Sequence, residues 1–117
     1  MTDLPTGVRA YFSDQPIGSR APRPGLFLDR DGILVEEVGY LHQIEMLRIQ
    51  AGAPALIRAA NDAGLPVVVV TNQSGIDRGL YAWDDYDGID REIESRLAAD
   101  GARLDGRMAC GYHPRFT

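Results

Sequence analysis

The sequence feature that most constrains the fold is the run of four valines at residues 67–70. Pro66 precedes this run, and the polar stretch TNQSG, residues 71–75, follows it. An unbroken β-branched run between turn-forming residues is typical of a short strand covered on both faces, because a half-exposed strand would alternate apolar and polar residues. Strands of this kind occur in parallel sheets that are flanked by helices. The run therefore predicts an α/β fold.

Two helical segments flank the predicted strand. Residues 51–64 have a proline in the first turn, where a helix tolerates one, and a glycine at the end, where helices stop. Residues 83–99 begin with acidic residues that suit the positive end of a helix, and their apolar residues recur at helical spacing. That apolar stripe consists of Tyr86, Ile89, Ile93 and Leu97.

The remaining segments complete the pattern. Residues 26–28 and 107–110 predict two further strands, and residues 33–50 predict an ordered loop with short pieces of structure. The resulting alternation of strands and helices predicts an α/β sandwich with a parallel sheet and right-handed crossovers. Residues 1–25 contain four prolines and little periodicity, so we expect an extended arm there, followed by one domain over residues 26–117.

Composition and charge narrow the class of protein. The chain has 117 residues, enough for one domain with a core, and 44% hydrophobic residues argue against disorder. A net charge of −5 offers no basic face for nucleic acid. A single cysteine excludes an internal disulfide and fits a reducing compartment. No apolar stretch has the length of a signal peptide core or a membrane span, so we expect a cytoplasmic protein.

Two predicted strands end in unusually polar turns. Asp29 and Asp31 follow residues 26–28, and Thr71 follows the valine run. Ligands of an open parallel sheet bind beyond the carboxyl ends of its strands, so these side chains converge if the strands are neighbours. Residues two apart on a strand share a side, which would put both carboxylates on the same side. Burying carboxylates is costly unless they have a partner or a ligand, so the pair suggests a site.

The second polar turn supplies hydrogen-bond donors. Thr71 has a hydroxyl, Asn72 and Gln73 have side-chain amides, and the backbone of Ser74 and Gly75 can turn its N–H groups inward. Such donors, a carboxylate pair and a Mg²⁺ ion together suit phosphoryl transfer, in which a carboxylate attacks phosphorus as the nucleophile. Mg²⁺ is the expected metal because it takes oxygen ligands and needs only one or two carboxylates.

These stretches resemble a known superfamily. "LFLDRDGIL" is similar to the first signature of the haloacid dehalogenase superfamily, and "VVVVTN" is similar to its second. The strings "FLDRDG", "GYL" and "TNQSGIDRG" narrow the resemblance to the phosphatases of the heptose bisphosphate and histidinol-phosphate group, over about residues 26–114. The resemblance implies a Rossmannoid three-layer α/β sandwich that is incomplete at its C-terminal side, and a phosphatase acting on a small phosphorylated metabolite, a sugar phosphate.

The resemblance also implies roles for individual residues. Asp29 would be the nucleophile and a Mg²⁺ ligand. Asp31 would be the general acid and base, with its backbone carbonyl on the metal, and Thr71 would hold the phosphoryl group. The residues that would shape the substrate pocket and its contacting loop are Asn72, Gln73, Ser74, Glu37, Val38, Gly39 and Tyr40.

The chain departs from the superfamily pattern in two respects. The third-signature lysine and the fourth-signature acidic residue lie after the third strand, whereas this sequence stops at Thr117 and contains no lysine. The zinc loop of the heptose phosphatases is not complete either, because Tyr112 stands where its first histidine is expected and Cys110 is the only cysteine. We therefore expect a truncated chain that binds Mg²⁺ and not zinc, and whose exposed sheet edge invites self-association.

Other interpretations remain open at the level of sequence. The chain could be a phosphate- or partner-binding module without turnover, or, less well supported, a receiver-like signalling domain phosphorylated on Asp29. The acidic pair could be a solvated turn, and residues 71–75 a helix cap. Arg30 is expected to point away from the aspartates and pair structurally, Arg78 to form a surface ion pair, and Tyr81 and Trp83 to pack.

Overall fold

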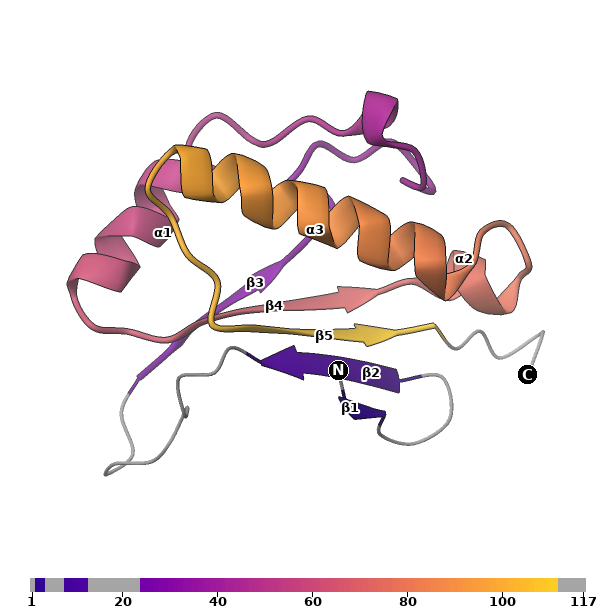
Figure 1. Cartoon of the computed structure of the whole chain (residues 1–117), viewed down its shortest axis with the longest axis horizontal. Helices are drawn as coiled ribbons and strands as arrows, with labels where there is room; N and C mark the ends of the chain where they lie inside the picture. Colours follow the sequence, from indigo (N-terminus) through magenta and orange to yellow (C-terminus); the bar gives the residue numbers. More distant parts are fainter. Residues whose placement is uncertain (1, 4–7, 13–23, 112–117) are drawn as a thin grey trace.

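The structure is a computed structural model that describes residues 2–3, 8–12 and 24–111. Its described strands form one five-stranded sheet in the order β1-β2-β5-β4-β3 (Figure 1). The pairs β3–β4 and β4–β5 are parallel, whereas β1–β2 and β2–β5 are antiparallel. The strands are β1 (Thr2–Asp3), β2 (Val8–Phe12), β3 (Leu26–Asp29), β4 (Val67–Asn72) and β5 (Gly106–Cys110). The predicted α/β fold with a parallel sheet of three strands is confirmed.

The N-terminal segment, predicted as an extended arm, contributes the strands β1 and β2 to the sheet. β2 pairs with β5 over its whole length, from Val8 opposite Cys110 to Phe12 opposite Gly106. The outer edge of β5 is therefore covered, because β2 satisfies the backbone groups that an edge strand leaves unpaired. Among the described strands, the edges of the sheet are β1 and, at the end of its parallel part, β3. Residues 1, 4–7 and 13–23 lie outside the described part of the chain.

The helices agree with the predicted segments. The structure contains the long helices α1 (Ala53–Asp62) and α3 (Trp83–Ala99), the short α2 (Ser74–Asp77) and the 3₁₀ turn η1 (Ile44–Met46). The Asp85 carboxylate accepts the backbone N–H of Ala82 at 2.8 Å and so caps α3. None of the helices in the described residues is both long and apolar enough to span a bilayer.

α1 and α3 cover the same face of the sheet (Figure 1). One core cluster joins apolar residues of both helices to residues of β3 and β4 that alternate along the strands. Its central members are Leu28, Val67 and Val69 from the strands, Ile57 from α1, and Ile89, Ile93 and Leu97 from α3. The stripe predicted for the second helix is therefore core, as expected.

The opposite face of the parallel strands is less covered than the valine run suggests. On this face Val70 is 41% exposed and Phe27 is 68% exposed, although Val68 is buried. The cause is that both long helices lie on one side, so the described residues form two of the three layers. The prediction of a strand covered on both faces is wrong at Val70.

The segment after β3 is the ordered loop that was predicted. Four of its apolar residues are almost completely buried, and Val35 bridges both Asp31 and Ile49 through backbone pairing. The buried residues of this loop are Leu34, Val35, Leu41 and Leu47. Because the loop is packed into the core, it holds the turn after β3 in a fixed place.

Candidate functional site

The tips of β3 and β4 lie side by side. In the parallel register Asp29, the last residue of β3, stands opposite Val70 of β4. The chain then turns, and Gly32 adopts a φ of +90°, a left-handed conformation that favours glycine. The Gly32 N–H donates to the Val35 carbonyl at 2.7 Å and closes the turn. This turn directs Asp31 toward the end of β4.

Asp31 joins the two strand tips through hydrogen bonds. Its Oδ2 accepts the Thr71 hydroxyl at 3.4 Å and the Gln73 side-chain amide at 3.0 Å. The same Gln73 amide donates to Thr71 Oγ1 at 2.8 Å. Of the convergence expected for Asp29, Asp31 and Thr71, the hydrogen bonds show the part between Asp31 and Thr71, which Gln73 joins at the carboxyl ends of neighbouring parallel strands.

Asp29 and Asn72 are not part of this network. Both are exposed at the ends of their strands, and the Asp29 carboxylate makes no hydrogen bond or ion pair with any residue in the described ranges. The alternation argument that put the two aspartates on one side applies only within a strand, and β3 ends at Asp29. The two carboxylates thus have different surroundings: that of Asp31 is bonded and that of Asp29 is open.

Arg30 is bonded to Asp31, although the sequence suggested that it points away. Its Nε and Nη2 each lie 3.3 Å from an oxygen of Asp31, and its Nη1 lies 3.3 Å from Oδ1 of Asp90 on α3. The Arg30 side chain is 1% exposed and that of Asp90 is 6% exposed. Arg30 is structurally paired as expected, but one of its two partners is a predicted site residue.

Asp90 is the residue that sequence reasoning missed. It lies four residues after Tyr86 and three before Ile93, on the apolar stripe of α3, so an aspartate at a core position was the available signal. Arg107 of β5 approaches its Oδ2 at 3.5 Å. Burial raises the pKa of Asp90, and the neighbouring Arg30 guanidinium opposes that rise. Burial alone would lower the pKa of Arg30, but Asp90 and Asp31 raise it, so the guanidinium stays charged.

Aromatic rings line the network beside Gln73. The Tyr81 hydroxyl donates to Gln73 Oε1, and burial raises the pKa of Tyr81 to about 12, so this donor keeps its proton at neutral pH. The ring centroid of Tyr40 lies 6.4 Å from that of Tyr81, and the His42 ring stacks on Tyr81 at 6.0 Å. Arg78 bonds the Tyr40 hydroxyl and lies 5.4 Å from the centre of that ring. Tyr40, from the predicted substrate loop, is thus connected to the network through Tyr81.

Gly75 gives these rings their space. A Cβ at this position would lie 2.4 Å from Cε1 of Tyr81 and 2.8 Å from Cδ1 of Tyr40, both closer than side-chain atoms approach each other. Gln73 precedes α2, but its side chain caps no backbone group of that helix. Gln73 therefore occupies the cap position of α2, as the helix-cap interpretation of residues 71–75 expects. Its side chain, however, donates to Asp31 and Thr71 and not to the helix.

The other predicted loop residues stand apart from Asp31 in the described contacts. Glu37 accepts the backbone N–H of Gly39 at 2.7 Å, and Gly39 has a φ of +83°. This is a tight turn that glycine favours, on an exposed part of the loop. Ser74 begins α2, where its carbonyl accepts the N–H of Arg78 at 3.1 Å. Among the described hydrogen bonds, none joins these residues to the side chain of Asp31 or Thr71.

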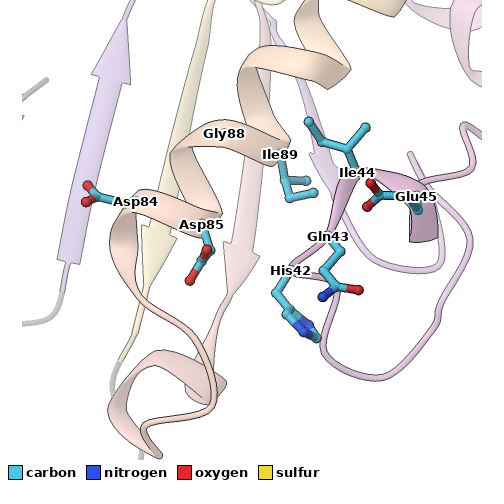
Figure 2. A pocket seen from close by; sticks show the side chains of 8 residues that line it. All are labelled: His42, Gln43, Ile44, Glu45, Asp84, Asp85, Gly88 and Ile89. Atoms are coloured by element: carbon cyan, nitrogen blue, oxygen red, sulfur yellow. The ribbon is translucent and has the colours of Figure 1, made fainter.

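A cavity of about 440 Å³ lies between the loop and the first turns of α3. Figure 2 shows its lining, with residues 42–45 of the loop facing residues of α3. The lining residues are His42, Gln43, Ile44, Glu45, Asp84, Asp85, Gly88 and Ile89. None of them belongs to the predicted catalytic set, although His42 stacks on Tyr81 and so borders both regions.

The carboxylate oxygens at the strand tips are suitable ligands for Mg²⁺, but they are too few to fill its coordination shell. Asp29 and Asp31 offer oxygen ligands, which Mg²⁺ prefers, and water commonly fills its remaining positions. In the described ranges no three His, Cys, Asp or Glu side chains gather into a metal-binding group. Tyr112, on which the zinc argument rests, lies outside the described residues, so the expectation of no zinc stays a prediction.

Comparison with known proteins gives close relatives. No family model matches the chain. It is 42% identical over 90 residues to D-glycero-D-manno-heptose-1,7-bisphosphate 7-phosphatase of Thermosynechococcus vestitus, covering 76% of this chain and 46% of the relative. A crystal structure from Mesorhizobium loti, described as a HAD-like phosphatase, superposes with a TM-score of 0.78 at 36% identity, over 92% of this chain and 51% of that one.

A second crystal structure contains ligands. The D,D-heptose 1,7-bisphosphate phosphatase of B. bronchiseptica, complexed with magnesium and phosphate, superposes with a TM-score of 0.71 at 28% identity. The match covers 76% of this chain and 50% of that one. The chain therefore spans about half the length of the relatives that it matches.

Proposed function

Because this chain belongs to the haloacid dehalogenase-like phosphatases, in the group of the heptose bisphosphate phosphatases, we propose that it hydrolyses the phosphomonoester of a small phosphorylated sugar. The observation that carries the proposal is the hydrogen-bonded group of Asp31, Thr71 and Gln73 at the tips of two parallel strands. Such a group presents a carboxylate and two donors toward one small volume, as phosphoryl transfer requires.

The proposed reaction uses the two aspartates in turn. The Asp29 carboxylate attacks phosphorus and forms an aspartyl phosphate, while the sugar oxygen leaves with a proton from Asp31. Asp31 then takes a proton from water, which attacks the aspartyl phosphate and releases inorganic phosphate and free Asp29. The open position of Asp29 and the bonded position of Asp31 support this division of roles, because a nucleophile needs access and a proton carrier needs a fixed place.

The remaining residues would bind the substrate and the metal. Asp29 and the backbone carbonyl of Asp31 would hold Mg²⁺, which when bound offsets the repulsion between the nucleophile and the anionic phosphoryl group. Thr71 would bind the phosphoryl oxygens. We propose a cytoplasmic location for this chemistry. The residues proposed to shape the pocket are Asn72, Gln73, Ser74, Glu37, Gly39 and Tyr40.

A matched pair of variants tests the proposal. The chain is incubated with Mg²⁺ and a panel of sugar phosphates that includes a heptose 1,7-bisphosphate, and released inorganic phosphate is measured. Asp29→Asn is expected to abolish release, because the amide is not a nucleophile. Asp62→Asn makes the same change on an exposed residue of α1, which leads into the opposite end of β4, and is expected to leave release unchanged. Equal rates in both variants would contradict the role of Asp29.

A second candidate function is binding without turnover. The observation that favours it is the pair of donors at the strand tips, Thr71 and Gln73, which can bind an anion whether or not a bond is broken. In that case calorimetry would detect inorganic phosphate binding in the presence of Mg²⁺, with loss of binding in Thr71→Val and no phosphate release from any sugar phosphate. Release that depends on Asp29 would reject this candidate.

A further inference from the structure

We infer that the buried pair of Asp90 and Arg30 is a positioning device, in which α3 holds the Arg30 guanidinium and the guanidinium fixes the orientation of the Asp31 carboxylate. The inference rests on the proposed function only for the chemical use of Asp31. Its physical content is an arrangement of three side chains, which can be observed whether or not the chain turns over a substrate.

The contact between Arg30 and Asp31 is two-pronged. Nε lies 3.3 Å from Oδ2 and Nη2 lies 3.3 Å from Oδ1, so one edge of the guanidinium meets both carboxylate oxygens. A single hydrogen bond would let the carboxylate rotate, whereas contact at both oxygens with a planar fork sets the plane of the carboxylate. The outward side of Oδ2 is then presented to Gln73 and Thr71.

The guanidinium is itself held in place. It is buried, its third nitrogen lies 3.3 Å from Asp90, and its carbon lies 5.7 Å from the centre of the Tyr86 ring. Asp90 is held in turn by the Tyr86 hydroxyl and by Arg107 of β5. A continuous set of contacts thus runs from β5 and α3 to the turn that carries Asp31, and each member is fixed by at least two partners.

The distribution of contacts distinguishes positioning from simple packing. Asp90 and Arg107 already link α3 to β5, so the helix does not need Arg30 to be attached to the sheet. Arg30 instead directs two of its three polar contacts at Asp31 and one at Asp90. Asp29, the other carboxylate of the turn, has no such partner among the described residues. The device therefore acts on one aspartate of the two.

The test compares variants of the full chain by NMR. Asp90→Asn keeps the size of the side chain and removes its charge, Arg30→Lys keeps the charge and removes the fork, and Asp90→Glu keeps both charge and acceptor. Glu92→Gln is the matched control, because Glu92 lies on the same helix and pairs only with Arg96, at 2.9 Å, in the described contacts. The signals followed are the Gln73 side-chain amide and the Asp31 carboxyl carbon, and circular dichroism monitors folding.

Asp90→Asn and Arg30→Lys are expected to shift both signals, Asp90→Glu to return them toward wild type, and Glu92→Gln to leave them unchanged. Wild-type signals for Gln73 and Asp31 in a folded Asp90→Asn chain would overturn the inference. If Asp90→Asn does not fold, Arg30→Lys decides in the same way, because its buried charge remains beside Asp90.

Where turnover is present, kcat of Asp90→Asn is expected to fall about 10-fold with KM unchanged, and an unchanged kcat would overturn the inference. A wild-type chain without turnover would contradict the proposed function alone.

Discussion

Gln73 and Asp31 are bonded across the tips of two strands, with the Gln73 amide 3.0 Å from Oδ2 of Asp31. Gln73 is 3% exposed, and its other polar atom accepts the Tyr81 hydroxyl. One glutamine therefore links the turn after β3, the end of β4 and the aromatic rings of the loop. Because buried polar groups are costly to leave unpaired, the loss of Gln73 should destabilise all three of these segments.

Gln73→Leu is predicted to lower the free energy of unfolding by about 1–3 kcal/mol, because it leaves the buried Tyr81 hydroxyl without an acceptor. Tyr81→Phe alone should cost less, about 0.5–1.5 kcal/mol, since it breaks only the bond to Gln73, whereas Gln73→Leu also removes the bonds to Asp31 and Thr71. In the double variant the two costs should not add, because the second change removes a group that the first has already left unpaired. The free energies of unfolding of wild type, both single variants and the double variant are measured by urea unfolding monitored by circular dichroism. Strictly additive costs would contradict the bond between Gln73 and Tyr81.

Gly75→Ala is predicted to destabilise the chain by about 1–3 kcal/mol, as expected for overpacking. The added methyl would lie 2.4 Å from a ring atom of Tyr81. Gly88→Ala is the matched control, because Gly88 lies inside α3 and a Cβ there meets nothing within 4 Å. That change should be neutral or stabilising by up to about 1 kcal/mol, since alanine favours helix more than glycine does. Thermal unfolding separates the two, and equal effects would mean that the rings can move aside.

The strands and helices were predictable where local signals are strong. The valine run, the glycines after each helix and the apolar stripe of α3 all fix structure within a few residues of themselves. β2 was missed because its partner is far away in the chain, with Val8 opposite Cys110. Its alternation of Val8, Ala10 and Phe12 is a weak strand signal that the surrounding prolines obscured. Pairing over such a distance is decided by the free edge of β5, which no local pattern reveals.

The candidate site likewise has one part that could be predicted from the sequence and one part that could not. Asp31, Thr71 and Gln73 could be grouped from sequence, because parallel neighbours bring their polar ends to one edge. The pairing of Arg30 with Asp90 could not, because it depends on which turn of α3 lies over the strand tip. An aspartate within an apolar stripe signals a buried partner without naming it. The partner is known only once helix and sheet are docked.

The pH dependence of stability is predicted to contain a contribution from Tyr81. Its pKa is about 12 in the folded chain, raised by burial, against about 10 in an unfolded chain. Between these values the folded chain holds a proton that the unfolded chain has lost, so stability falls as pH rises through this window and is unaffected below it. Unfolding in urea at about pH 8 and about pH 11, for wild type and Tyr81→Phe, measures the effect. The advantage of wild type should shrink at the higher pH, and a constant difference would contradict the assignment.

The open edge of β3 is predicted to make the chain self-associate. No strand of the described part pairs with the outer edge of β3, and its Phe27 is 68% exposed on the face that neither long helix covers. Unpaired strand edges beside exposed apolar side chains are sites of association. Sedimentation should show a mass that rises with concentration for wild type and remains near that of a monomer for Phe27→Lys. Ile44→Lys, which adds the same charge to an exposed residue of η1, is expected to behave as wild type. A monodisperse wild-type monomer at high concentration would contradict the prediction.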